Sequence, residues 1–172
     1  ALITARRGLR IGVKSADCVP ILLFDPVCGA VAAIHSGWKG TLKNIAAAAS
    51  GRMSAEFGTR PCDLKAVIGP CIHMEAFEVG EELVNAFCPD AAAIDSYPFA
   101  KMLPHPQTGI VRWHLDLPGI CRSQLLECGI PDGNIEMRPE CTWEQHSRFF
   151  SARWLGKNFG EQRIISCIML LD

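Results

Sequence analysis

The sequence predicts a single α+β domain in which helices cover a mixed β-sheet. Strand-like and helical segments intermix without a regular strand–helix alternation or an internal repeat, which disfavours a doubly wound parallel sheet. The 172 residues contain no linker that would divide them, and 49% of them are hydrophobic. This length and composition suffice for one substantial core.

The first half of the chain is expected to begin with a strand over residues 9–15 and a β-hairpin over residues 19–35. Two apolar runs, 21–24 and 29–34, flank the turn Asp25-Pro26-Val27-Cys28. A helix is expected over residues 41–57. Its apolar residues recur at helical spacing, and they are Leu42, Ile45, Ala46, Ala49 and Met53.

The second half is expected to alternate strands and helices with one long loop. The expected elements are a strand at 65–69, a helix at 80–88, a loop-rich stretch to about 111, a helix at 116–128, and strands at 135–141, 148–154 and 163–171. The helix at 116–128 has the clearest local signals, with Asp116 as N-cap, Pro118 in the first turn and Gly129 as the stop. Residues 156–160 are expected to form the turn of a final hairpin.

Cys18 and His35 are the leading candidates for a functional pair. They lie equally far from the centre of the first hairpin turn if that centre falls between Pro26 and Val27. Directly opposed residues in an antiparallel ladder place their Cβ atoms about 5 Å apart. A thiolate and an imidazole at that spacing can bind one zinc ion. The alternative is that both are packing residues, because cysteine is commonly a small buried hydrophobe.

The loop after His35 is a candidate anion site. Ser36-Gly37-Trp38-Lys39-Gly40 leads from the second hairpin strand into the expected helix. Two glycines let the backbone approach a ligand, and free N–H groups at a helix N-terminus favour an anion. Lys39 adds a positive charge, so phosphate is the expected ligand. A solvated turn is the alternative.

Seven sequence blocks resemble one known family, the purine nucleoside phosphorylases formerly called laccase-domain or multicopper polyphenol oxidoreductase proteins. The blocks are Ser15-Ala16-Asp17-Cys18-Val19-Pro20, Ala33-Ile34-His35-Ser36-Gly37-Trp38-Lys39-Gly40, Ile68-Gly69-Pro70-Cys71-Ile72, Phe77-Glu78-Val79-Gly80, Leu115-Asp116-Leu117, Cys141-Thr142 and Arg148-Phe149-Phe150-Ser151. They occur in the family's order and span almost the whole chain. The resemblance implies the same α+β fold for residues 1–172.

The resemblance also implies a site. Cys18 and His35 match the family's zinc ligands and would be catalytic, and the matching segments make Lys39, Ser151 and Arg153 the expected substrate-binding residues. Two segments depart from the family pattern. Lys39 stands where the family usually has Arg, and Ala152-Arg153-Trp154 stands where it has Tyr-Arg-Arg.

The third zinc ligand of the family is the His of a Gln-Val-His-Gly motif, which lies before the part that this sequence matches. The chain is therefore expected to lack the N-terminal part of such a domain. Four further histidines are possible substitutes, and none lies in a metal-ligand spacing pattern. They are His73, His105, His114 and His146.

Three classes of function remain open. The first is a zinc-dependent purine nucleoside phosphorylase, for which the resemblance implies adenosine, inosine or methylthioadenosine as substrates and adenosine deaminase as a second activity. The second is a hydrolase with Cys18 as nucleophile and His35 as base. The third is a non-catalytic remnant or subunit. A copper oxidase is disfavoured, because several copper ions need many imidazole ligands and the five histidines are scattered.

Composition indicates a cytoplasmic protein whose partners are small molecules. With seventeen basic and eighteen acidic residues, the chain has no excess of positive charge that would attract a nucleic acid. No apolar run approaches the roughly 18 residues of a membrane span. The nine cysteines include no Cys-x-x-Cys pair, and their odd number leaves one unpaired in any full disulfide scheme, so reduced thiols are expected.

Overall fold

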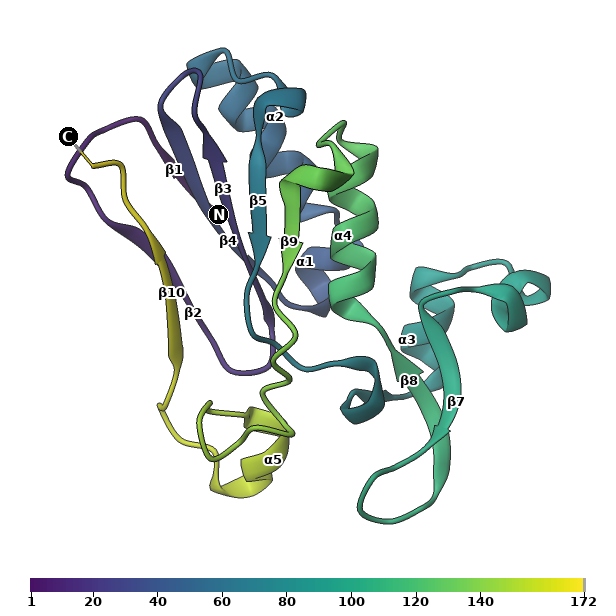
Figure 1. Ribbon diagram of the computed structural model, residues 1–172. Coiled ribbons are helices and arrows are strands. Elements are labelled where there is room, and N and C mark those ends of the chain that lie inside the picture. Colours follow the sequence, from purple (N-terminus) through teal and green to yellow (C-terminus); the bar gives the residue numbers. More distant parts are fainter. Residues whose placement is uncertain (172) are drawn as a thin grey trace.

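A five-stranded mixed sheet forms the centre of the molecule (Figure 1). The structure is a computed structural model that describes residues 1–171. The strands in spatial order are β1 (Leu2–Thr4), β4 (Ala30–Ser36), β3 (Val19–Asp25), β5 (Lys65–Ile68) and β9 (Ile135–Met137). The β5–β9 pair is parallel and the other three pairs are antiparallel. The predicted α+β class with a mixed sheet is confirmed.

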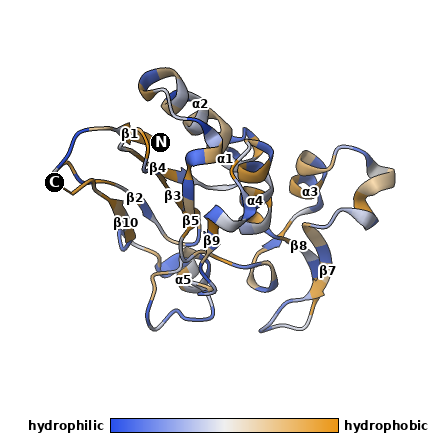
Figure 2. Ribbon diagram, turned by 45° about the horizontal axis from the view of Figure 1, so that its top comes forward, coloured by the Kyte–Doolittle hydropathy of each residue, from blue (hydrophilic) through white to orange (hydrophobic). Residues whose placement is uncertain are grey.

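Three helices lie on one side of this sheet, and a two-stranded ribbon lies on the other (Figure 1). The helices are α1 (Trp38–Leu42), α2 (Ile45–Phe57) and α4 (Leu117–Glu127). The ribbon pairs β2 (Ile11–Ser15) with β10 (Ile164–Ile168) in antiparallel order. Because both faces of the sheet are covered, nearly all of β4 is buried, including Ile34, and hydrophobic colouring gathers on the central strands (Figure 2).

The helix expected over 41–57 is two helices. Asn44 separates α1 from α2, because its backbone has φ 51° and ψ 56° in the left-handed region. Its side chain then caps α2 by accepting a hydrogen bond of 3.1 Å from the Ala47 amide. Helical periodicity does not register such a break, since Asn tolerates the left-handed conformation without a Gly or Pro signal.

A small antiparallel sheet was not expected, and one of its strands, β7 (Ala100–Pro104), lies inside the stretch expected to be loop-rich. The strands of this sheet in order are β6 (Glu78–Val79), β8 (Val111–Leu115) and β7. This sheet lies beside α3 (Glu81–Phe87) and extends away from the central sheet (Figure 1). Short 3₁₀ turns complete the chain at Pro61–Asp63, Met74–Ala76, Ala91–Ser96, Asp132–Asn134 and Gly156–Asn158.

The predictions of a strand at 148–154 and of a final hairpin with its turn at 156–160 are both wrong. Residues Ala152–Leu155 form α5, which Ser151 caps by accepting a hydrogen bond of 3.1 Å from the Trp154 amide. The last strand, β10, pairs with β2 near the start of the chain. The chain segment at 148–151 therefore carries no strand to complete a hairpin.

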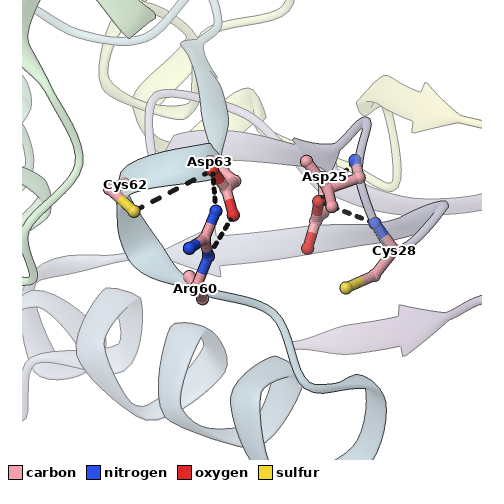
Figure 3. A network of polar contacts seen from close by, with 6 residues as sticks. Asp25, Cys28, Arg60, Cys62 and Asp63 are labelled. Carbon is pink, nitrogen blue, oxygen red and sulfur yellow. Dashed lines mark hydrogen bonds and ion pairs between the residues drawn. The ribbon is translucent and has the colours of Figure 1, made fainter.

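The first hairpin forms as expected, with a register two residues away from the predicted one. Asp25 pairs with Ala30 and Pro20 pairs with His35, so Cys18 and His35 are not direct partners. The turn has the expected four residues but is shifted by one position, to residues 26–29. The Asp25 carboxylate accepts hydrogen bonds from the Val27 and Cys28 amides at 2.8 and 3.0 Å (Figure 3). The centre of the turn consequently lies between residues 27 and 28.

No helix within residues 1–171 is long and apolar enough to cross a membrane.

Candidate functional site

Cys18 and His35 converge on Gly37 despite the altered register. A Cβ atom placed on Gly37 would stand 3.0 Å from Cys18 Sγ and 3.5 Å from His35 Nε2. A register shift of two residues leaves side chains on the same face, because they alternate with a period of two. The thiol and the imidazole therefore border the same small space.

The imidazole of His35 is held by the neighbouring strand β2. Its Nδ1 lies 2.8 Å from the carbonyl oxygen of Lys14. A carbonyl can only accept, so Nδ1 carries the proton and Nε2 keeps its lone pair. This is the arrangement in which metal-binding histidines are oriented, with the other ring nitrogen donating to a carbonyl or carboxylate. The free Nε2 is the atom that faces Gly37 and Cys18.

Cys18 is positioned by its neighbour Asp17, whose backbone has φ 81°. The Asp17 side chain is buried, and it accepts hydrogen bonds of 2.7 Å from the Thr142 hydroxyl and 2.7 Å from the Arg153 amide. Its carbonyl accepts a further bond of 3.0 Å from the Ile72 amide. A left-handed non-glycine residue is strained and persists only where its surroundings fix it. These three bonds fix the bend that directs Cys18.

The thiol of Cys18 is not activated by its own surroundings. Burial, and next the negative charge of Asp17, raise the pKa of Cys18 above its ordinary value. A raised pKa keeps the thiol protonated near neutral pH, because both causes disfavour the thiolate. A bound cation would reverse this, since a coordinating thiol is deprotonated outright.

Two cavities share part of their lining, and one of them borders Cys18. The first, of about 380 Å³, is lined by Ala16, Asp17, Cys18, Ile72, Phe77, Ala152, Arg153 and Gly156. The second, of about 520 Å³, is lined by Trp38, Phe77, Glu78, Val79, Gly80, Glu82, Leu83, Ala86 and Arg153. Phe77 and Arg153 belong to both linings, so the two cavities are neighbouring parts of one cleft.

The structure places the three expected substrate-binding residues differently. Arg153 lines the cleft, donates a hydrogen bond of 2.9 Å to the Glu78 carbonyl and lies 5.3 Å from the centroid of the Phe77 ring. Lys39 is exposed, and its Nζ lies 5.2 Å from the ring of Trp38 in the same cleft. Ser151 is buried, and its hydroxyl caps α5. Their role in substrate binding stays a prediction.

The anion loop expected before a long helix is part of a short helix. Gly37 is the N-cap of α1, and Lys39 and Gly40 lie within its five residues. Gly37 has an ordinary extended backbone, with φ −76° and ψ 171°. It is needed for the close approach of Cys18 Sγ rather than for an unusual turn. The predicted phosphate binding would therefore depend on the charge of Lys39 more than on a helix dipole.

The other histidines do not complete a metal site. No group of three or more His, Cys, Asp or Glu side chains in the described part of the chain is arranged to hold a metal ion. His114 is buried and its Nδ1 donates to the Met74 carbonyl at 2.8 Å. His146 stacks on Trp154 with ring centroids 3.5 Å apart.

Sequence reasoning missed the supporting residues of this site. Asp17, Thr142 and Phe77 each stand inside a recognised sequence block, yet none was assigned a role. The available signal was the acidic residue within an otherwise apolar block before Cys18. Lys14 contributes a backbone carbonyl to His35, and no side-chain pattern could have indicated it.

The sequence matches the family described as multi-copper polyphenol oxidoreductase laccase over residues 1–171. A purine nucleoside phosphorylase of Bacteroides thetaiotaomicron is 42% identical over 170 residues, which are 99% of this chain and 60% of the relative. A protein named adenosine deaminase RL5, from an unknown prokaryotic organism, is 39% identical over 93% of this chain and 58% of its own length. The chain thus spans about three fifths of these relatives.

Two solved structures of similar sequence share the fold of this chain. The hypothetical protein YfiH of Bacillus licheniformis superposes with a TM-score of 0.84 at 32% identity, covering 98% of this chain and 60% of its own. YlmD of Geobacillus stearothermophilus gives a TM-score of 0.81 at 29% identity, covering 99% and 60%. The seven sequence blocks predict this relationship, and the chain belongs to the multi-copper polyphenol oxidoreductase laccase family.

Proposed function

We propose that the chain forms the catalytic part of a zinc-dependent purine nucleoside phosphorylase that acts on adenosine, inosine or methylthioadenosine and also deaminates adenosine. One observation carries the proposal. Cys18 Sγ and His35 Nε2 border the same space, and the hydrogen bond from His35 Nδ1 to the Lys14 carbonyl leaves Nε2 free to bind a metal. The names of two relatives support the substrate class.

The residues present fit zinc as two of its protein ligands. A sulfur and an imidazole nitrogen are donors that zinc prefers. A bound zinc ion supplies a Lewis acid and a reactive water to such a site. Because its pKa is raised, the Cys18 thiol is protonated in the metal-free site. Binding of a metal to Cys18 would therefore release the thiol proton.

The chain's own residues would bind and orient the other reactants. In phosphorolysis a phosphate oxygen forms a bond to the ribose C1′ while the bond from C1′ to the purine nitrogen breaks. Arg153 lines the cleft and Lys39 lies against Trp38, which also lines it, and these two cations would neutralise the phosphate.

The hydrolase alternative is weaker on physical grounds. A nucleophilic cysteine needs a lowered pKa, whereas burial and then Asp17 raise the pKa of Cys18. His35 also keeps Nδ1 occupied by a neutral carbonyl rather than by a carboxylate that would stabilise an imidazolium. A non-catalytic role stays open to the experiment below.

The third zinc ligand is proposed to come from outside the matched part of the relatives. Catalytic zinc sites typically use three protein ligands and one open position. Cys18 and His35 provide two, so residues 1–172 alone are expected to bind zinc weakly and to turn over nucleosides slowly. The relatives extend well beyond the part that this chain matches.

The test combines metal analysis with phosphate-dependent release of hypoxanthine from inosine. The chain is measured alone and fused behind the upstream segment of the Bacteroides thetaiotaomicron relative. Zinc content and phosphorolysis should both rise in the fusion and fall again in its Cys18→Ala and His35→Ala forms. Cys62→Ala is the matched control, because Cys62 is an exposed free thiol that lines neither cavity. Amide hydrolysis without metal would establish the hydrolase instead, and no activity in the fusion would establish a non-catalytic role.

A further inference from the structure

A third cavity, of about 370 Å³, is lined by residues of α1, α3 and α4 and of the segment before β7. Its lining shares Ala86 with the cavity of about 520 Å³ and no residue with the cavity that contains Cys18. Nothing in the proposed function uses this cavity. We infer that it binds an organic ammonium ion whose nitrogen carries methyl groups. This inference does not depend on the proposed function.

Three aromatic side chains line the third cavity, and they are Phe87, Tyr97 and Phe99. The ring centroids of Tyr97 and Phe99 lie 5.5 Å apart, and the two ring planes make an angle of 78°. The face of an aromatic ring carries negative partial charge and attracts a cation within about 6 Å. Two nearly perpendicular rings form a corner that can contact different sides of one rounded cation. Aromatic side chains recognise quaternary ammonium groups in this way.

The charge of the lining also favours a cation. Among the described residues that line the cavity, Glu127 is the only charged side chain, and none is Lys, Arg or His. The Glu127 carboxylate accepts a hydrogen bond of 3.0 Å from the Ser123 hydroxyl and forms no ion pair with a described residue. Gln124 donates from Nε2 to the Thr41 carbonyl at 2.7 Å, and its buried Oε1 has no partner in the described part of the chain. Both groups give this wall a negative potential, which would disfavour an anionic ligand.

Tyr97 and Glu127 influence each other although they belong to different elements. Burial is the largest cause that raises the pKa of Tyr97, followed by Cys88 and Glu127, and the raised value is about 12. An electrostatic effect of Glu127 on the Tyr97 hydroxyl requires the two groups to lie close together. The carboxylate and the aromatic corner therefore belong to one site rather than to opposite ends of the cavity.

The composition of the lining selects a methylated nitrogen over a primary ammonium group. A primary ammonium group has three N–H donors, and each donor that loses water needs an acceptor. The lining supplies one carboxylate and three aromatic rings, which suit a cation with a diffuse charge and an apolar surface. A volume of about 370 Å³ lies within the usual range for small-molecule pockets. Choline is therefore a suitable probe.

The first experiment measures choline binding to the metal-free chain by NMR titration. The N-methyl resonance of choline should move upfield, because the methyl groups lie over ring faces. The matched probe is 3,3-dimethylbutan-1-ol, in which a carbon atom replaces the nitrogen and the shape is retained. Choline should bind about fivefold or more tightly than this neutral isostere and than ethanolamine, a primary ammonium ion.

The second experiment repeats the titration with variants of the lining. Tyr97→Leu and Phe99→Leu should each weaken choline binding about fivefold. Phe150→Leu is their control, because Phe150 is an exposed aromatic residue outside the lining. Glu127→Gln should weaken choline binding about threefold and leave the neutral isostere unaffected. Glu81→Gln removes the same charge from α3 without touching the cavity and should change neither.

Each possible result bears on the inference. Equal affinities for choline and 3,3-dimethylbutan-1-ol would show an apolar pocket and overturn the ammonium site, and equal affinities for choline and ethanolamine would overturn the methylated class. A wild-type dissociation constant above about 10 mM would overturn the site as well. Circular dichroism verifies folding of the variants. If the aromatic variants do not fold, the exposed Glu127 provides the test, and choline binding that Glu127→Gln leaves unchanged would refute the site.

Discussion

Replacing Gly37 with Ala tests whether the space between the thiol and the imidazole is the metal site. The added methyl group would stand 3.0 Å from Cys18 Sγ and 3.5 Å from His35 Nε2. Carbon atoms in favourable contact are about 3.5–4.0 Å from their neighbours, so the sulfur must move by several tenths of an ångström while the imidazole need not. The donor atoms would then be misplaced relative to each other.

The same substitution should hardly change folding stability. Gly37 has φ −76° and ψ 171°, which any residue adopts, so the methyl group adds no backbone strain. Reduced freedom of the unfolded chain stabilises such a variant by about 0.4–1 kcal/mol. This gain in the free energy of unfolding offsets the cost of displacing the Cys18 thiol. We expect the free energy of unfolding to stay within about 1 kcal/mol of the wild type.

Metal binding should respond much more strongly. Disturbing the orientation of a zinc ligand typically lowers affinity about 10- to 100-fold, which corresponds to about 1.4–2.8 kcal/mol. The assay is the zinc concentration that half-protects Cys18 from alkylation, read by peptide mass spectrometry, because this remains measurable for a weak site. Gly51→Ala is the control, since Gly51 lies in α2 with no atom near its added methyl group. Equal protection in Gly37→Ala and wild type would refute the placement of the metal.

Three further outcomes follow from the same geometry. Asp17→Ala should lower the free energy of unfolding, measured by urea titration, by about 2–4 kcal/mol, because the Thr142 hydroxyl and the Arg153 amide lose their acceptor at a left-handed residue. Asp17→Asn should lower it less. A loss below about 0.5 kcal/mol would show that the bend needs no support. In the metal-free chain, burial and then Asp17 raise the pKa of Cys18, so its alkylation rate should rise at higher pH than in a free peptide of residues 15–20; faster reaction at neutral pH would favour the hydrolase. Burial alone raises the pKa of Asp25, but the hydrogen bonds that it accepts lower it overall, below the ordinary value of 3.8. This carboxylate stabilises the fold above pH 3.8, and the contribution is lost as pH falls through its lowered pKa, so the stability difference between wild type and Asp25→Asn should shrink on acidification below about pH 4; a constant difference would contradict this.

Elements with local signals were predictable from the sequence. Helix α4 has the expected cap, since the Asp116 carboxylate accepts a hydrogen bond of 3.0 Å from the Gly119 amide, and Gly129 follows its end with φ 92°. Both signals act within one turn of the helix, so the sequence contains them in full. The strand expected at 65–69 is likewise present as β5.

The pairing of segments distant in sequence was not predictable, although the last strand itself, expected at 163–171, is present as β10. The last strand pairs with β2, and Ile168 lies opposite Ile11. Neither segment contains a local sequence signal that identifies the other as its partner. A local interpretation therefore paired the last strand with the nearest strand-like segment, at 148–154. That segment instead forms α5, because Ser151 offers an N-cap and the Asp17 carboxylate receives the Arg153 amide. The second partner lies more than a hundred residues away.

The predicted proximity of Cys18 and His35 tolerated an error in register because side chains alternate between the two faces of a sheet. A mistake of one residue would have placed Cys18 and His35 on opposite faces, whereas a mistake of two residues preserved the face. The observed register pairs Val19 with Ser36 and so places Cys18 opposite Gly37. What the pattern could not provide is the left-handed bend at Asp17, directly before Cys18. That bend depends on Ile72, Thr142 and Arg153, all distant in sequence. The orientation of the thiol is thus a property of the assembled fold, and substitutions at these distant positions should alter Cys18 before they alter His35.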